Sequence, residues 1–327
     1  MGRMKLLDKV INNSTGQVEG YCVVKSVIVK SNVKGSDYLD MILADSGGEV
    51  SAKLWDYSPE QHGQFAPDTV VKVRGTINVW KDAEQLKVDR IRNTASDDEV
   101  EMAELIPCAP RDGVEMYDEL YALAETFECG DLKMLTQYIL RENREKLIKW
   151  PAASKLHHAV RAGLLFHTLT MIRSARSICD VYSELYPIDR DLVYAGIILH
   201  DVAKVDEIEV GGLGLATGYS PAGLLLGHIN MGVANVERAA AELMIDDEIK
   251  LLVEHMLLSH HGVPEYGSSR YPMFPEAEIV SQVDVLDAKL YEMYDALSGV
   301  PEGEFTERQW ALDNRQLYHK RAKRTTD

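Results

Sequence analysis

The sequence predicts two domains of different fold class, an N-terminal all-β barrel and a C-terminal all-α domain. Residues 17–92 contain alternating and β-branched apolar runs separated by turn sequences, which is typical of strands. From about residue 115 the apolar residues recur three and four positions apart, which is typical of helices. We therefore expect a barrel over residues 1–95, an acidic linker over 96–114 and a helical domain over 115–327.

Five strand-like runs make up the first part of the chain. A DSGG turn joins the second run to the third, which predicts a hairpin. Residues 58–68 form one longer connection, with the Pro and Gly content of a loop or a short helix. This count and layout match an OB-fold barrel. The runs cover residues 18–31, 37–45, 49–56, 69–80 and 85–92.

OB barrels commonly bind single-stranded nucleic acid, with aromatic rings stacking on bases and cations following the backbone. The predicted strands carry side chains of both kinds. The alternative is that the strand aromatics pack the barrel or its junction, and the sequence leaves both interpretations open. The candidates for nucleic-acid binding are Tyr38, Lys53, Trp55, Tyr57, Lys72, Arg74 and Trp80.

Composition and length place the chain among ordinary globular proteins. Its 327 residues suffice for two domains, and 46% of them are hydrophobic. We find no run of about 18 apolar residues that could span a bilayer, and the first residues lack the features of a signal peptide. The four cysteines are scattered and form no CxxC pair. We therefore expect a cytoplasmic protein without a membrane segment.

The charge is unevenly distributed along the chain. The net charge is −17, which at first argues against a nucleic-acid-binding protein. Residues 1–95, however, hold 13 Lys and Arg against 12 Asp and Glu, a net of +1. Residues 96–120 hold one Arg against nine acids. The basic tail at residues 320–324 is either a solvated end or a contact to phosphates.

The second part contains three long helical patterns, over residues 119–127, 131–150 and 157–182. The apolar spacing over 115–150 fits either a subunit interface of a homo-oligomer or packing within the chain. Residues 209–223 are rich in glycine, but they lack the preceding strand and the Gly-Lys-Ser/Thr ending of a phosphate-binding loop. We expect a loop or a small hairpin there.

Histidines are concentrated in the helical part. Eight of the ten fall between residues 157 and 261, and several lie in or at the edge of apolar helical stretches. A single histidine on such a face is usually a satisfied core residue, but so many together with inward-facing carboxylates indicate a metal site. The residues concerned are His167, His200, Asp201, His228, His260, His261, Asp284 and Asp287.

Imidazole nitrogen and carboxylate oxygen together suit Mn²⁺, Fe²⁺, Co²⁺ or Zn²⁺, and the absence of cysteine argues against a closed structural zinc site. Asp201 could bridge two cations, because each of its oxygens can bind one. Two such cations could activate a water and stabilise a phosphorane-like transition state. Lys204 follows Asp201 by one helical turn, so it either neutralises a phosphate oxygen in that state or is a surface charge.

The order of these motifs resembles the HD-domain metal-dependent phosphohydrolase superfamily. The motifs are GLLFHT, LHDVAK, GHI, SHHG and VDVLDAK, in that order. Together with a preceding OB barrel, they are similar to the YhaM-type 3′–5′ exoribonuclease family over almost the whole chain. The resemblance implies cleavage of single-stranded RNA from its 3′ end to nucleoside 5′-monophosphates.

The resemblance also implies a set of ligands. One metal, which we expect to be Mn²⁺, would be bound by His167, His200, Asp201 and Asp284. A second would share Asp201 and use His228 and His260, with His261 as the rival to His260 or as an additional ligand; Mg²⁺ is a further possible metal. Asp287 would support the site without binding metal. His157 and His158 have no firm role, His255 is interpreted as structural, and Phe166 stands where we expect an acidic residue.

Three functions are therefore compared. The first is a metal-dependent 3′–5′ exonuclease of single-stranded RNA, with single-stranded DNA as an open extension. The second is a phosphohydrolase of a nucleotide or a cyclic dinucleotide, which the net charge of −18 over residues 96–327 favours somewhat. The third is a non-catalytic OB-fold nucleic-acid-binding protein with a structural metal site.

Overall fold

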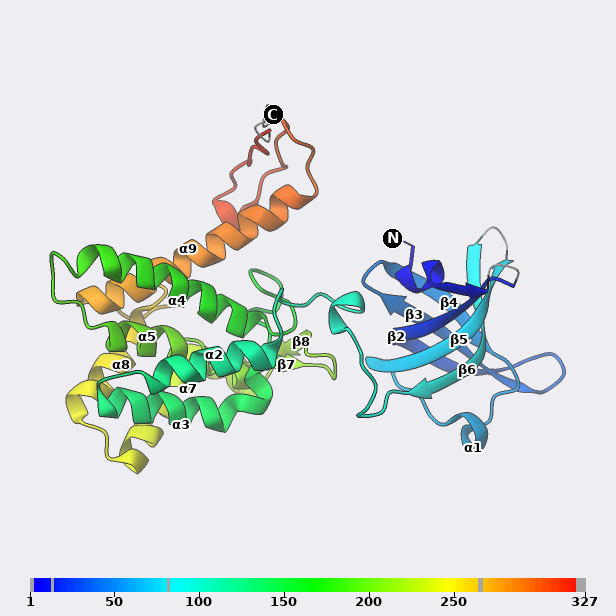
Figure 1. Ribbon diagram of the computed structural model, residues 1–327, viewed down its shortest axis with the longest axis horizontal. Coiled ribbons are helices and arrows are strands. Elements are labelled where there is room, and N and C mark those ends of the chain that lie inside the picture. The colour runs from blue at the N-terminus through cyan, green and yellow to red at the C-terminus, as the bar shows by residue number, and fades with distance from the viewer. Residues whose placement is uncertain (1–2, 13–14, 81–82, 264–266, 322–327) are drawn as a thin grey trace. The chain divides into compact units, whose positions relative to one another are not determined.

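The structure, a computed structural model, describes residues 3–12, 15–80, 83–263 and 267–321 (Figure 1). Most of the chain divides into two compact units, Met1–Cys108 and Ala109–Val210 with Gly214–Asp327. The division between residues 108 and 109 falls inside the segment that the sequence marks as an acidic linker. The two predicted fold classes are confirmed, an all-β barrel followed by a helical domain.

The first unit is a closed barrel. Its five long strands follow the order β2-β3-β4-β6-β5, and β5 pairs back onto β2 to close the barrel. The β4–β6 pair is parallel and the other pairs are antiparallel. This is the OB-fold order, with a short additional strand at one edge. The strands are β1 (Val10–Asn12), β2 (Gln17–Ser31), β3 (Asp37–Asp45), β4 (Gly48–Leu54), β5 (Thr69–Trp80) and β6 (Ala83–Asn93).

Alternation along the strands determines which side chains fill the barrel. In β4, Val50, Ala52 and Leu54 are buried, whereas Ser51 and Lys53 point outward and are partly exposed. All five predicted strands are confirmed. The longer connection after β4 contains the short helix α1 (Pro59–His62).

The second unit is helical. It contains one small antiparallel hairpin, β7 (Ile208–Val210) with β8 (Ala216–Tyr219), where the sequence predicts a loop or a hairpin. None of the helices that the structure describes combines the length and the apolar character needed to cross a bilayer. The helices are α2 (Gly113–Glu125), α3 (Gly130–Leu147), α4 (Gly163–Tyr182), α5 (Arg190–Leu199), α6 (Lys204–Glu207), α7 (Pro221–Leu243), α8 (Asp247–Ser259) and α9 (Pro275–Ser298).

The helical pattern over 157–182 is correct only from Gly163 onward. The residues before it form an irregular loop in which His158 and Ala162 have positive φ angles of 51° and 58°. The loop packs closely against the start of α4, because a Cβ at Gly163 would lie 2.0 Å from the carbonyl oxygen of His158. Periodicity alone does not reveal this boundary.

The apolar faces of α2 and α3 are buried within the chain. Met116, Leu120, Leu132 and Leu135 belong to the core of the helical unit, together with residues of α4 and α5. Packing within the chain therefore accounts for the apolar spacing over 115–150. A homo-oligomer stays a prediction, and its subunit interface would have to lie on another surface.

The close approach at Gly163 leads to a first prediction. Gly163→Ala should reduce the free energy of unfolding of the helical unit by about 1–3 kcal/mol, because the new methyl group overlaps the His158 carbonyl. Thermal unfolding followed by far-UV circular dichroism measures this. Gly130→Ala is the matched control, since no atom lies within 4 Å of the Cβ position at Gly130. Equal melting temperatures for the two variants would contradict the argument.

Candidate metal centre

The predicted ligands come from five helices and converge on one place. His167 is the fifth residue of α4, and Asp284 lies in the first half of α9. The pairs His200-Asp201 and His260-His261 directly follow the last residues of α5 and α8. His228 follows Gly227, a non-helical residue of α7 whose φ of 72° is a conformation that glycine adopts readily. Contacts between α4, α5 and α9 bring these segments together (Figure 1).

Asp201 lies at the centre of this cluster and is only 2% exposed. Its Oδ1 lies 3.3 Å from Nε2 of His228 and 3.7 Å from Nε2 of His260. Its Oδ2 lies 3.3 Å from Nε2 of His200 and 3.9 Å from Nε2 of His167. Each carboxylate oxygen therefore faces a different pair of imidazoles.

The other ring nitrogen of each histidine is engaged by an acceptor. Nδ1 of His200 lies 2.7 Å from the carbonyl oxygen of Ile197, and Nδ1 of His260 lies 2.7 Å from that of Leu257. A carbonyl oxygen can only accept, so Nδ1 carries the proton in both rings. Nε2 of each ring is then left with a lone pair that points toward Asp201.

For the remaining two histidines, His167 and His228, a carboxylate accepts the hydrogen bond from Nδ1. Nδ1 of His167 donates to Oδ2 of Asp287 at 2.7 Å, and Nδ1 of His228 donates to Oε2 of Glu207 at 3.0 Å. Such partners fix the ring orientation and increase the basicity of a metal-binding histidine. Asp287 thus supports a candidate ligand, which is the role that the sequence predicts for it.

The cluster contains buried polar atoms that lack partners. Within the described part of the chain, Oδ1 of Asp201 and Nε2 of His167, His200, His228 and His260 are buried and form no hydrogen bond. Leaving one such atom unsatisfied costs about 1–3 kcal/mol. Five of them facing one another fit a cation well, and the nitrogen and oxygen set suits Mn²⁺, Fe²⁺, Co²⁺ or Zn²⁺.

The possible ligand atoms form overlapping groups, within each of which all atoms lie no more than 4.8 Å apart. One group combines Asp201 with both His260 and His261, so the two alternative ligands of the second metal lie close together. Asp284 joins the cluster through Oδ1, which lies 3.3 Å from Nε2 of His167. The structure therefore brings all seven predicted ligands together. The groups are Asp201, His228, His260 and His261; His167, His200 and Asp201; His200, His260 and Asp284; and His158, His167 and Asp287.

The cluster also determines the charge state of its members. Burial raises the pKa of Asp201, but the neighbouring His200 and Lys204 more than offset this and hold the pKa well below its ordinary value. Lys204 is buried too, which lowers its pKa, yet the Asp201 carboxylate raises it above the usual value. Nζ of Lys204 donates to Oδ2 of Asp201 at 2.5 Å. Lys204 is therefore a buried cation of the site, and the surface-charge interpretation is wrong.

The histidines differ among themselves. Burial holds the pKa of His260 well below its ordinary value, so this ring stays neutral. His167 is also buried, which lowers its pKa, but the neighbouring carboxylates of Asp284 and Asp287 raise it to about 9. A cation bound at Nε2 of His167 would therefore displace a proton, as is general for metal binding to protonated ligands.

The structure adds two supporting residues, Glu207, which the sequence analysis missed, and His158, to which it assigned no firm role. Glu207 lies six positions after Asp201 and faces His228 only because α7 folds back across it. His158 donates from Nε2 to Asp287 at 2.9 Å and lies 4.1 Å from the ring of Tyr291, centre to centre. Phe166, where an acid was expected, lies beside His158. His255 is outside the cluster, and its Nε2 accepts from the backbone of Met273, in agreement with a structural role.

On the barrel, the structure brings together only some of the predicted nucleic-acid contacts. The rings of Tyr38 and Trp55 lie 4.6 Å apart, and Nζ of Lys53 lies 5.5 and 5.6 Å from their centres. We call Tyr38, Lys53 and Trp55 the aromatic cluster. Tyr57 donates to the carbonyl of Gly63 and thus holds the loop after β4. The side chain of Trp80 lies outside the described residues, as do residues 322–324 of the basic tail.

Lys72 and Arg74 are separate from the aromatic cluster. Lys72 is paired with Tyr21 near the start of β2, whereas Tyr38 is paired with Lys30 near its end. The closure of the barrel therefore places the candidates Lys72 and Arg74 beside a different end of β2 from Tyr38.

Comparison with known proteins agrees with this architecture. Residues 164–289, which include all the candidate ligands, match the model of the HD domain. The 3′-5′ exoribonuclease YhaM of Bacillus licheniformis is 39% identical over 302 residues, or 92% of this chain and 94% of the relative. The protein of the same name from Bacillus subtilis (strain 168) is 38% identical, with the same coverage of both chains.

An OB barrel followed by an HD domain with a histidine and aspartate cluster defines a two-domain protein of the HD phosphohydrolase class. The similarity to the Bacillus proteins extends over both domains. The chain belongs to the YhaM 3′–5′ exoribonuclease family.

The hydrogen bond from His167 to Asp287 leads to a second prediction. Asp287→Asn should weaken Mn²⁺ binding about 10- to 100-fold, because an amide supports the imidazole less well than a carboxylate does. Isothermal titration calorimetry measures the affinity. Asp295→Asn, on the exposed second half of α9, is the matched control. Unchanged Mn²⁺ affinity in Asp287→Asn would show that this hydrogen bond does not support a ligand.

Proposed function

We propose that this chain is a metal-dependent exoribonuclease that degrades single-stranded RNA from its 3′ end and releases nucleoside 5′-monophosphates. The observation that carries the proposal is the buried cluster in which four imidazole nitrogens and Oδ1 of Asp201 face one another without hydrogen-bond partners among the described residues. The choice of RNA and the direction of degradation come from the family to which the chain belongs.

We assign the ligands to two cations, with Mn²⁺ as the first choice and Fe²⁺, Co²⁺, Zn²⁺ or Mg²⁺ as alternatives. The division of Asp201 supports this assignment, since Oδ2 faces His167 and His200 while Oδ1 faces His228 and His260. Asp284 would complete the first site and His261 the second. Asp201 would bridge them.

Bound divalent cations would activate a water and offset charge on the phosphodiester. Lys204 holds Oδ2 of Asp201 and so fixes the orientation of the bridging carboxylate. Its side chain is 10% exposed, and its ammonium is a fixed positive charge of the cluster that can stabilise a phosphate oxygen. Asp287 and Glu207 keep the rings of His167 and His228 in the ligating orientation.

The aromatic cluster on the barrel would bind the RNA chain. The Trp55 side chain, in a residue that is 40% exposed, offers a ring face for stacking, and Lys53 lies over both rings, where it can also contact a phosphate. Single-stranded DNA as a second substrate, a homo-oligomeric state and a cytoplasmic location stay predictions. For the last, the four cysteines without disulfides suit a reducing compartment.

A third prediction tests the metal centre. Asp201→Asn should reduce RNA degradation by more than about 100-fold, since it alters the carboxylate shared by both proposed sites, whereas loss of a supporting residue costs about 10- to 100-fold. The substrate is a 5′-labelled single-stranded RNA of about 20 nucleotides, incubated with Mn²⁺ and resolved on a sequencing gel. The wild-type chain should give a ladder that shortens from the 3′ end, and a chelator should abolish it.

The matched control is Asp206→Asn, because the Asp206 carboxylate pairs with Lys146 outside the cluster. It should degrade RNA like the wild type. If the wild-type chain binds Mn²⁺ and leaves RNA intact but hydrolyses a nucleotide or a cyclic dinucleotide, the second function is correct. If it binds metal and hydrolyses none of these, the non-catalytic interpretation is correct.

A fourth prediction tests the aromatic cluster. Trp55→Ala should raise the dissociation constant for single-stranded RNA about 5- to 150-fold, which corresponds to about 1–3 kcal/mol for one stacked base. Fluorescence anisotropy with labelled RNA measures the change. Trp310→Ala, which removes an exposed tryptophan of the helical unit, is the control. Equal affinities of the two variants would exclude stacking on Trp55.

A further inference from the structure

Two neighbouring strands of the barrel place like charges directly opposite each other. In the β5–β6 pair, Arg74 is opposite Arg90 and Lys72 is opposite Arg92. Val73 and Ile91 lie between these pairs and are buried in the barrel core, so all four cations point outward from it. Like charges in directly opposite positions destabilise a sheet. An anion bound beside two adjacent pairs of this kind would therefore reduce the repulsion between the cations.

The chain supplies only part of the compensating charge. Glu19 on β2 is shared, at 4.0 Å from Nζ of Lys72 and 3.9 Å from Nε of Arg74. Arg92 forms a bidentate pair with Asp98, at 2.6 and 2.7 Å. Asp98 also accepts from Tyr21 and from the backbone of Ala95, so its oxygens are fully used.

Arg90 is the least compensated of the four cations. Its side chain is exposed, and no carboxylate of the described residues forms an ion pair with it. The neighbouring Asp89 is also exposed and lines the same region. Arg90 therefore keeps a guanidinium whose five donors are available to a ligand.

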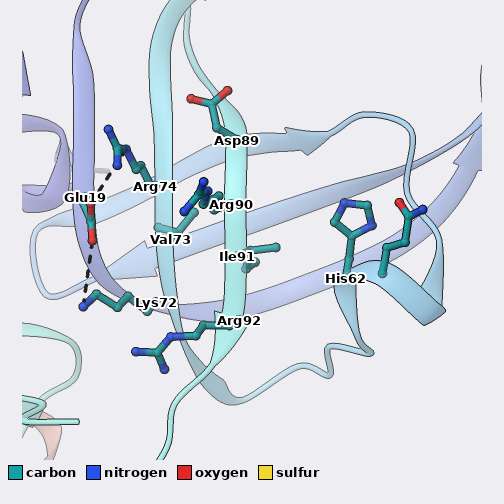
Figure 2. A pocket seen from close by; sticks show the side chains of 10 residues that line it. Glu19, His62, Lys72, Val73, Arg74, Asp89, Arg90, Ile91 and Arg92 are labelled. Carbon is teal, nitrogen blue, oxygen red and sulfur yellow. Dashed lines mark ion pairs between the residues drawn. The ribbon is translucent and has the colours of Figure 1, made fainter.

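These side chains line a cavity of about 490 Å³. Figure 2 shows the cationic side chains on adjacent strands, with His62 of α1 across from Arg90 and Arg92. Four cations against Glu19, Asp89 and Asp98, which pairs with Arg92, give this region a net charge of +1, in a chain whose net charge is −17. We call this region the basic pocket. Its lining residues are Glu19, Gln61, His62, Lys72, Val73, Arg74, Asp89, Arg90, Ile91 and Arg92.

The spacing of the cations indicates the kind of anion. Lys72 and Arg74 are two residues apart on β5, which corresponds to about 7 Å along a strand. The two cross-strand pairs therefore offer two anion positions in a row, and arginine suits phosphate because its planar fork can donate two parallel hydrogen bonds. A polyanion with successive phosphates fits this arrangement better than a single phosphate does.

We propose that the basic pocket binds the phosphodiester backbone of RNA, at a site separate from the aromatic cluster. The proposal rests on the proposed exoribonuclease function, which supplies RNA as the ligand. The two sites lie beside different ends of β2, where the pairing partners Tyr21 and Lys30 are nine positions apart. They are therefore at most about 30 Å apart along the strand, and a strand of RNA long enough to reach both contacts the barrel twice.

Charge reversal at Arg90 tests the pocket. The full-length chain with Mn²⁺ is titrated into a labelled RNA of about 20 nucleotides whose 3′-terminal linkages are methylphosphonates that resist hydrolysis. Arg90→Glu should raise the dissociation constant roughly tenfold at low salt. It should also reduce the slope of log K against log salt by about 0.7 for each phosphate that the variant no longer neutralises. Asp89→Asn should have the opposite effect and tighten binding.

Lys5→Glu is the matched control, because it makes the same change in charge at an exposed position of the barrel outside the pocket. Folding is checked by thermal unfolding. Arg90→Glu should melt no lower than the wild type, since the new carboxylate lies opposite Arg74 and replaces a repulsive pair by an attractive one.

Equal affinities and equal salt slopes of Arg90→Glu and Lys5→Glu would overturn the proposal. A second result would also overturn it: Arg90→Glu weakens the binding of inorganic phosphate or a nucleoside monophosphate but leaves the affinity for RNA unchanged. The pocket would then be a site for small anions. The two proposals can fail separately. If the wild-type chain does not shorten RNA but Arg90→Glu still weakens RNA binding, the exonuclease function fails and the pocket stands.

Discussion

The buried carboxylate of Asp201 is the constraint on which the helical unit depends. Both of its oxygens face imidazole nitrogens that carry lone pairs, and Lys204 provides only one hydrogen bond to one of the oxygens. Lone pairs that face one another repel in a medium of low dielectric constant, and these atoms are buried. A bound cation converts the repulsion into attraction, so binding of metal and stability of the helical unit should be coupled.

The positions of the ligands in their helices explain which supporting residues the site needs. His200 and His260 directly follow α5 and α8, where the last carbonyl groups have no partner within the helix, so each ring finds an acceptor three residues before it. His167 and His228 are followed by helix and have no such free carbonyl. Their acceptors must come from other segments, and these are the carboxylates of Asp287 and Glu207.

The sequence was sufficient to predict whatever depends on local pattern and residue type. The five strands follow from alternation, and a cluster of histidines and aspartates follows from these residue types in apolar helical stretches. The choice of seven of them as ligands came from the family resemblance. Glu207 could not be found in this way, because its contact with His228 depends on the kink at Gly227. The separation of Lys72 and Arg74 from Tyr38 depends on strand register and barrel closure, which are long-range properties that the runs themselves do not contain.

A net charge of −17 is compatible with a polyanionic substrate because charges act locally in salt solution. Exposed charges further apart than about 8–10 Å are largely screened at physiological ionic strength. A phosphate near the barrel therefore interacts mainly with the cations of the basic pocket or with Lys53. Most of the acidic residues lie elsewhere in the sequence, since residues 96–327 carry a net charge of −18. Carboxylates that bind divalent cations become part of a positive site once the metal is present. The uneven distribution of charge along the chain thus matches the two proposed sites, with aspartates at the proposed metal centre and cations at the proposed RNA-binding pocket.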